Sequence, residues 1–205
     1  MKSRIFGNEY LYLKTVLEGE FSSSTSGSMT RQLEQLFGEV FDSRYAISFV
    51  NGTATMHTAL ESMGIGEGDE VIVPPLTMAA TSFAVLQCNA TPVFADVNPQ
   101  TFQISSESIA AKITDKTKAI ITVALYGLSP DMDAINDIAK AHNLFVIEDN
   151  AECFLGKYKG RLVGTLGDCA SYSFQSSKHL TSGEGGIVLT DDLDLAEKIR
   201  KVQSL

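Results

Sequence analysis

Short apolar segments alternate with helical segments along most of the chain, and this alternation restricts its possible folds more than any other feature. The apolar segments predict strands at 45–50, 68–74, 91–97, 118–125, 144–149, 169–174 and 186–190. One predicted helix follows the first strand and ends at 63, and the others lie at about 78–88, 106–113, 131–142 and from 193 onward. This order indicates an α/β protein with a mostly parallel sheet. Because the strands are almost continuously apolar, we expect helices on both faces, in a three-layer α/β/α arrangement.

Two further helices are predicted before the first strand, at 8–19 and 30–41, with a serine-rich loop at 22–28 between them. The chain has 205 residues, and 44% of them are hydrophobic, which is enough for one substantial core. We therefore expect a single domain over 1–205. It would consist of an N-terminal helical arm at 1–44 and an α/β core at 45–205.

Composition argues against several classes of protein. No apolar stretch approaches the ~20 residues of a membrane helix, and Asn8 and Glu9 stand where an export signal would be apolar. Cys88, Cys153 and Cys169 are odd in number and lack the spacing of zinc ligands, so a reducing cytoplasm is expected. The net charge of -9, without a basic cluster, argues against nucleic-acid binding. We expect no membrane partner, no nucleic-acid partner and no metal site.

In parallel α/β sheets, ligands bind beyond the carboxyl ends of the strands, so the residues that follow each strand are the first candidates. Gly52, Thr53 and Ala54 follow the first strand and open a helix. Backbone N–H groups at a helix N-terminus bind anions, especially phosphate. The alternative is an ordinary helix cap with a turn glycine. Neither the GxxxxGK nor the GxGxxG pattern is present, so no nucleotide P-loop or dinucleotide site is predicted.

Two charged residues follow later strands. Asp149 ends the fifth strand, where a buried carboxylate is costly unless it has a partner. It either caps the next element or faces a cationic ligand group. Lys178 lies in "FQSSKHLTSGEGG", which is either a solvated surface loop or the position of an amine that can form a Schiff base. The three histidines are scattered and are expected to be structural or exposed.

A phosphate cradle, a strand-end carboxylate and a lysine suit a cofactor that has a phosphate, a ring nitrogen and an aldehyde. Pyridoxal phosphate has all three. The residues alone leave open whether the three sites meet, because they could belong to different regions of the molecule.

Four segments extend this interpretation: "FVNGTATMHTAL", "GDEVIVPPLTMAATSFAVLQCNATPVFADVNPQTFQI", "VIEDNAECFLGKYKGRLVGTLGDCASYSF" and "KHLTSGEGGIVLT". In this order they resemble the DegT/DnrJ/EryC1/StrS family of pyridoxal-phosphate-dependent sugar aminotransferases. The resemblance implies the large domain of fold type I and runs from about residue 6 to the last residue.

The resemblance also implies a role for each matching residue. Lys178 matches the lysine that carries the cofactor aldehyde, and Asp149 matches the carboxylate that pairs with the ring nitrogen. Gly52, Thr53 and Ala54 match the phosphate-binding turn. A further match, Ser173, stands where a hydroxyl also reaches the phosphate.

Three positions depart from the usual residues of the family. Met78 stands where many relatives stack an aromatic ring on the cofactor, although an apolar, polarizable side chain can still cover a ring face. Glu152 stands where many have glutamine or histidine near the ring hydroxyl. Ala124 stands where relatives often have histidine, which bears on substrate contacts. Lys178 itself favours transamination, because dehydratase-like members carry histidine there.

The resemblance thus implies transfer of an amino group, from glutamate, to a keto group of a nucleotide-linked sugar in surface polysaccharide or amino-sugar biosynthesis. It also implies a homodimer with sites formed between subunits. Family members continue into a C-terminal small domain, which is expected to be absent from these 205 residues. The alternatives are a catalytically incomplete cofactor-binding fragment and a pyridoxal-phosphate-dependent sugar dehydratase.

Overall fold

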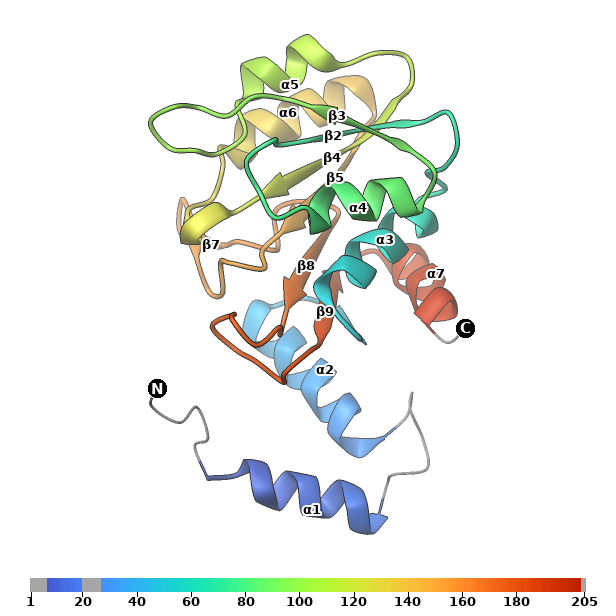
Figure 1. The fold of residues 1–205 in the computed structure, drawn as a ribbon, viewed down its shortest axis with the longest axis vertical. Helices are drawn as coiled ribbons and strands as arrows, with labels where there is room; N and C mark the ends of the chain where they lie inside the picture. Colours follow the sequence, from blue (N-terminus) through green and yellow to red (C-terminus); the bar gives the residue numbers. More distant parts are fainter. Residues whose placement is uncertain (1–6, 20–26, 204–205) are drawn as a thin grey trace.

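The computed structural model describes residues 7–19 and 27–203. Most of the loop predicted at 22–28 lies outside this part of the chain. The two predicted N-terminal helices are present as α1 (Glu9–Gly19) and α2 (Ser28–Phe41). No residue of α1 is buried, and Figure 1 shows this helix apart from the sheet. In contrast, α2 packs on the sheet through Phe37 and Phe41, whose rings stack with centroids 4.7 Å apart.

Seven strands form one sheet in the order β1-β9-β8-β5-β4-β2-β3. Their bounds are β1 (Tyr45–Phe49), β2 (Glu70–Val73), β3 (Thr91–Phe94), β4 (Thr117–Val123), β5 (Phe145–Asp149), β8 (Cys169–Ser173) and β9 (Gly186–Thr190). Strands β3, β2, β4, β5 and β8 are parallel to one another. β9 runs antiparallel to both of its neighbours in the sheet, β1 and β8. The predicted, mostly parallel sheet is therefore confirmed.

Helices cover both faces of this sheet (Figure 1). One face packs against α3 (Gly52–Ser62), α4 (Ala80–Gln87) and α7 (Leu193–Gln203). The other face packs against α2, α5 (Ser106–Lys112) and α6 (Met132–His142). Successive residues of a strand point to opposite faces, so each strand supplies both layers of core. The predicted three-layer arrangement is confirmed. The proposed division into an arm at 1–44 and a core at 45–205 stays a prediction.

One strand and one helix show how the sequence builds these layers. In β5, Val146 joins the core on one face and Ile147 the core on the other. In α6, Met132, Ile135 and Ala139 share the buried face. Full burial of each such aliphatic side chain contributes about 1.5–3 kcal/mol. This burial holds the strand ends in fixed positions relative to one another.

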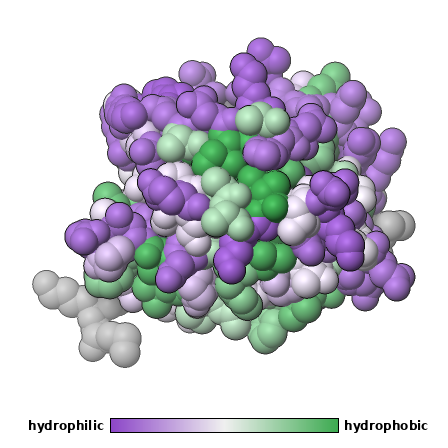
Figure 2. Space-filling view, turned by 90° about the horizontal axis from the view of Figure 1, so that it is seen from above, coloured by the Kyte–Doolittle hydropathy of each residue, from purple (hydrophilic) through white to green (hydrophobic). Residues whose placement is uncertain are grey.

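Two small elements were not predicted. A two-stranded hairpin, β6 (Lys157–Tyr158) and β7 (Arg161–Leu162), follows β5, and a short 3-10 turn, η1 (Leu125–Gly127), follows β4. The surface seen in Figure 2 is mostly hydrophilic around a central apolar strip. In the described residues, no helix combines the length and the apolar character needed to cross a membrane.

Candidate active site

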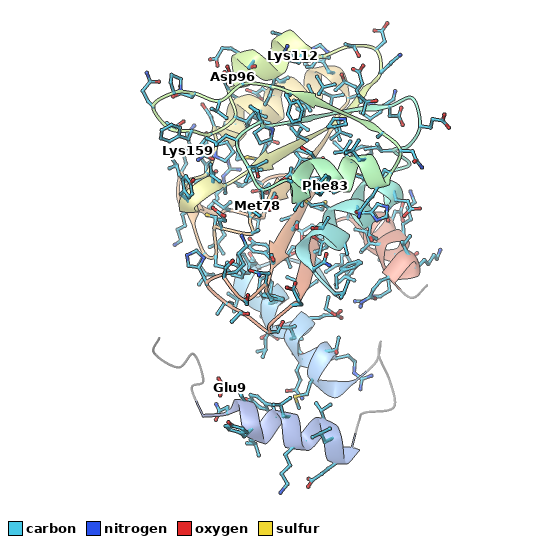
Figure 3. All side chains as sticks on the ribbon, in the orientation of Figure 1. Glu9, Met78, Phe83, Asp96, Lys112 and Lys159 are labelled. Carbon is cyan, nitrogen blue, oxygen red and sulfur yellow. The ribbon has the colours of Figure 1, made fainter. Side chains whose placement is uncertain are left out.

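A cavity of about 450 Å³ opens at the carboxyl ends of the parallel strands. Its lining brings together almost all of the residues predicted for the cofactor site: Gly52, Thr53, Met78, Asp149, Glu152, Ser173 and Lys178. Ala54 is not among the lining residues, because it lies one step further into α3. Met78, on the segment between β2 and α4, is 65% exposed (Figure 3). The glycine turn, the carboxylate and the lysine therefore meet at one place, which the residues alone did not establish.

The turn after β1 is pressed against the end of β8. Asn51 caps α3 by accepting the N–H of Ala54 at 2.8 Å, as the helix-cap alternative expects. The carbonyl of Gly52 accepts the Thr55 hydroxyl at 2.5 Å and the Ser171 hydroxyl at 3.3 Å. The first N–H groups of a helix have no intrahelical partner, so those of Gly52 and Thr53 remain suited to an anion.

Gly52 allows this close approach. A Cβ atom at this position would lie 2.9 Å from the Cβ of Ser173, closer than carbon atoms can pack.

We expect Gly52→Ala to lower the free energy of unfolding by about 1–3 kcal/mol through overpacking. It should also weaken phosphate binding, because the turn must move away from Ser173. Thermal unfolding and a phosphate titration check both effects. In the control Gly66→Ala, the nearest atom to the new Cβ is 3.7 Å away. Equal stability and equal phosphate affinity of the two variants would contradict this account.

Asp149 is the buried acid of the cavity. It is only 5% exposed. Its Oδ2 accepts the Thr81 hydroxyl at 3.0 Å, and its Oδ1 accepts the N–H of Ala151 at 3.2 Å. Burial raises the pKa of this carboxyl, while the two hydrogen bonds and the positive charge of Lys178 oppose the rise. A cationic ligand group in the cavity would therefore lie near a buried carboxylate whose negative charge is only partly balanced by its surroundings.

Lys178 points into the cavity and not into bulk solvent. Its side chain is 15% exposed, and its Nζ lies 3.4 Å from Oε1 of Glu152. The other oxygen of Glu152 accepts the backbone N–H of Tyr126 at 3.2 Å. A second cavity of about 420 Å³ shares Glu152 and Lys178 with the first, so this ion pair borders both. The solvated-loop alternative does not describe this lysine.

Glu148, the neighbour of Asp149, has a structural role. It is 1% exposed, and its carboxylate accepts the N–H groups of Gly164, Leu166 and Gly167 at 2.7–2.8 Å. Burial raises the pKa of this carboxyl, and the three N–H donors oppose the rise. The carboxylate thus fixes the 164–167 loop beside β8. No role was predicted for Glu148 from the sequence.

The described part of the chain contains no group of three histidine, cysteine or acidic residues arranged to hold a metal ion. Cys88, Cys153 and Cys169 are buried and unbridged. The absence of a metal from the site remains a prediction.

The sequence pattern of the DegT/DnrJ/EryC1/StrS aminotransferase family matches residues 5–205. The chain belongs to this family. The resemblance inferred from the four segments and the predicted fold class are therefore confirmed.

Other members of the DegT/DnrJ/EryC1/StrS family are similar over nearly the whole chain. The GDP-perosamine synthase of Caulobacter vibrioides is 46% identical over 197 residues, which cover 96% of this chain and 53% of that protein. The crystal structure of an aminotransferase from Psychrobacter cryohalolentis is 44% identical, has a TM-score of 0.91, and matches over 95% of this chain and 50% of that one. A Bacillus subtilis structure named for NtdA with bound cofactor PMP is 35% identical, has a TM-score of 0.83, and matches over 91% of this chain and 42% of that one. The chain spans about half the length of the relatives it matches.

Proposed function

We propose that the cavity binds pyridoxal phosphate and that the protein uses it to transfer an amino group to a keto group of a nucleotide-linked sugar. The observation that carries this proposal is the convergence of Gly52, Asp149 and Lys178, which come from three different strand ends, on one cavity. The residues fit the group: the turn at Gly52 has no room for a Cβ, and Asp149 is a buried carboxylate that lacks full charge compensation. The related structure with bound PMP supports the same cofactor class.

Each residue has a distinct task in this proposal. The N–H groups of Gly52 and Thr53 and the hydroxyl of Ser173 would hold the phosphate, Asp149 would pair with the ring nitrogen, and Met78 would cover one ring face. When bound, the cofactor supplies an aldehyde that takes up an amino group and a ring that withdraws electrons.

Glu152 and Lys178, which are among the residues that border both cavities, would take part in the amine chemistry. With the cofactor bound, Lys178 would hold it through its aldehyde, and the lysine amine, when free, would take a proton from the α-carbon of the amino donor. Glu152, whose Oε1 lies 3.4 Å from that amine, would orient the lysine, and the family resemblance implies that it would also contact the ring hydroxyl.

The substrate class follows from the relatives and not from this chain's own geometry. The Caulobacter vibrioides relative is named for the synthesis of GDP-perosamine, an amino sugar linked to a nucleotide. We propose a substrate of this class, glutamate as donor, and a homodimer, as the family resemblance implies. Three unbridged cysteines favour a cytoplasmic setting.

The decisive experiment adds pyridoxal phosphate and follows the visible absorbance of the lysine-linked cofactor. We expect a new band in the wild-type protein and in the control Lys140→Ala, whose side chain is exposed on α6, and none in Lys178→Ala. Borohydride reduction and mass spectrometry should place the cofactor on Lys178. Absence of any band in the wild type would overturn the proposal.

Product analysis with glutamate and a GDP-linked keto sugar separates the alternatives. An amino sugar supports transamination, whereas a deoxy keto sugar supports the dehydratase. A band without any product supports cofactor binding alone by this chain.

A further inference from the structure

The turn η1 bridges the two cavities in a backbone conformation that needs support. Leu125 lines the first cavity and Tyr126 the second. Tyr126 adopts left-handed angles, φ 55° and ψ 26°, and Gly127 follows with φ 84°. A non-glycine residue is strained in this region, so contacts from elsewhere must hold the turn.

The first of these contacts comes from Gln103, in the segment between β3 and α5. This side chain is 4% exposed. Its Oε1 accepts the N–H of Leu125 at 3.3 Å, and its Nε2 donates to the carbonyl of Leu125 at 3.1 Å. One amide thus pairs with both backbone polar groups of Leu125, as a neighbouring strand would. Such a buried amide is costly unless it is hydrogen-bonded, which commits Gln103 to this arrangement.

The second contact links the same turn to the lysine. The N–H of Tyr126 donates to Oε2 of Glu152 at 3.2 Å, and Oε1 of Glu152 lies 3.4 Å from Nζ of Lys178. Continuous contacts therefore run from Gln103 through the turn and Glu152 to the lysine. Gln103 itself is outside the lining of both cavities.

We propose that Gln103 is a positioning residue for Lys178. By fixing the backbone of Leu125, it presents the N–H of Tyr126 to Glu152 and so sets where that carboxylate meets the lysine amine. The consequence for cofactor attachment rests on the proposed function, whereas the hold on the turn does not.

The test compares Gln103→Leu, which keeps the side-chain bulk and removes both hydrogen bonds to Leu125 together with the one that Nε2 donates to the Thr101 carbonyl at 3.3 Å, with Thr190→Val. Thr190 is as little exposed as Gln103, and its substitution removes the bond that its hydroxyl donates to the Asp168 carbonyl at 2.8 Å and the one that it accepts from the Asp192 N–H at 3.2 Å, at the opposite end of the sheet from the cavity. Two readouts are used: hydrogen exchange at the Tyr126 amide without cofactor, and the rate at which pyridoxal phosphate becomes attached to Lys178. We expect about tenfold faster exchange and about tenfold slower attachment in Gln103→Leu, since one net hydrogen bond is worth about a factor of ten. Neither readout should change in Thr190→Val.

A second variant keeps the test decisive if Gln103→Leu does not fold. In Gln103→Glu the carboxylate still accepts from Leu125 N–H, but it can donate to the Leu125 carbonyl only when protonated. Its defect in exchange protection should therefore shrink as the pH is lowered. Wild-type exchange and attachment rates in a folded Gln103 variant would overturn the proposal. If no variant and not even the wild type attaches the cofactor, the proposed function fails, and the exchange of the Tyr126 amide alone decides the role of Gln103.

Discussion

Asp149→Asn should make the cofactor-free protein more stable and at the same time remove most of its affinity for pyridoxal phosphate. The wild-type carboxylate is buried with only the Thr81 hydroxyl and the Ala151 N–H as hydrogen-bond partners. An asparagine can keep both contacts, because its oxygen accepts from Ala151 and its amide donates to Thr81. The threonine hydroxyl can then turn towards Thr77, whose hydroxyl oxygen lies 3.2 Å away. The variant avoids the cost of burying a charge, for an expected gain of about 1–3 kcal/mol.

The pH dependence of this gain has a definite sign. Burial raises the pKa of Asp149 in the folded state above its ordinary value of 3.8. The wild type therefore carries no charge-burial penalty below about pH 4, and the penalty grows as the pH rises through the raised pKa. The stability advantage of Asp149→Asn should be close to zero in acid and reach a plateau once the pH exceeds the raised pKa.

Thermal unfolding with and without the cofactor measures both effects of Asp149→Asn. In a chain of this size, each kcal/mol shifts the midpoint by about 2–4 °C. Cofactor at 100 times its dissociation constant should stabilise the wild type by about 2.7 kcal/mol. The variant should gain little, since losing one partner of a buried charge pair costs 2 kcal/mol or more, about 30-fold in affinity.

Asp137→Asn, which changes an exposed carboxylate on α6, is the matched control. We expect its stability and its stabilisation by the cofactor to equal those of the wild type. A lower midpoint for cofactor-free Asp149→Asn, or undiminished cofactor stabilisation, would contradict the role given to Asp149.

The largest loss of stability is expected from Glu148→Ala. This substitution leaves the buried N–H of Gly164 and the half-buried N–H groups of Leu166 and Gly167 without their acceptor. An unsatisfied buried donor costs about 1–3 kcal/mol, a half-buried one less, and relief from burying the carboxylate offsets part of the sum. We expect a net loss of about 3–5 kcal/mol, with disorder of the 164–167 loop.

Urea unfolding of a graded pair of variants tests this account. Glu148→Gln should lose less, about 1–3 kcal/mol, because its oxygen can still serve Leu166 and Gly167 while its amide group opposes the N–H of Gly164. Glu197→Gln makes the same charge change on the exposed side of α7 and should stay within about 0.5 kcal/mol of the wild type. If Glu148→Gln proved as stable as the wild type, the three hydrogen bonds would not hold the loop as described.

The layers and most element bounds could be predicted from the sequence because they follow from local patterns. The predicted helix at 131–142 is α6, which begins at Met132, after the cap residue Asp131, and ends at His142. The direction of β9 could not be predicted this way, because antiparallel and parallel buried strands have the same apolar composition. Its direction is set by pairing with β1, whose residues lie far away along the chain.

Within the site, the residues that a motif marks lie together at the first cavity, and their roles stay predictions. A residue that acts only through contacts created by folding carries no such motif. The different roles of Glu148 and Asp149 could have been predicted from the two-residue period of a strand, because neighbouring side chains point to opposite faces. No comparable signal exists for Gln103, since its partner Leu125 is 22 positions away along the chain and belongs to an irregular turn.

The antiparallel β9 has a consequence for how the protein forms. Thr190 of β9 pairs with Tyr45 of β1. In the described sheet, β9, the last strand along the chain, is therefore the one neighbour of β1, the first strand. Closing so long a loop is slow compared with forming local contacts. On a ribosome, β1 would have no sheet partner until β9 has emerged. We therefore expect the turn at Gly52, which follows β1, to reach its place beside Ser173 late in folding, and a ribosome-arrested chain that ends before β9 should depend on chaperones to remain in solution.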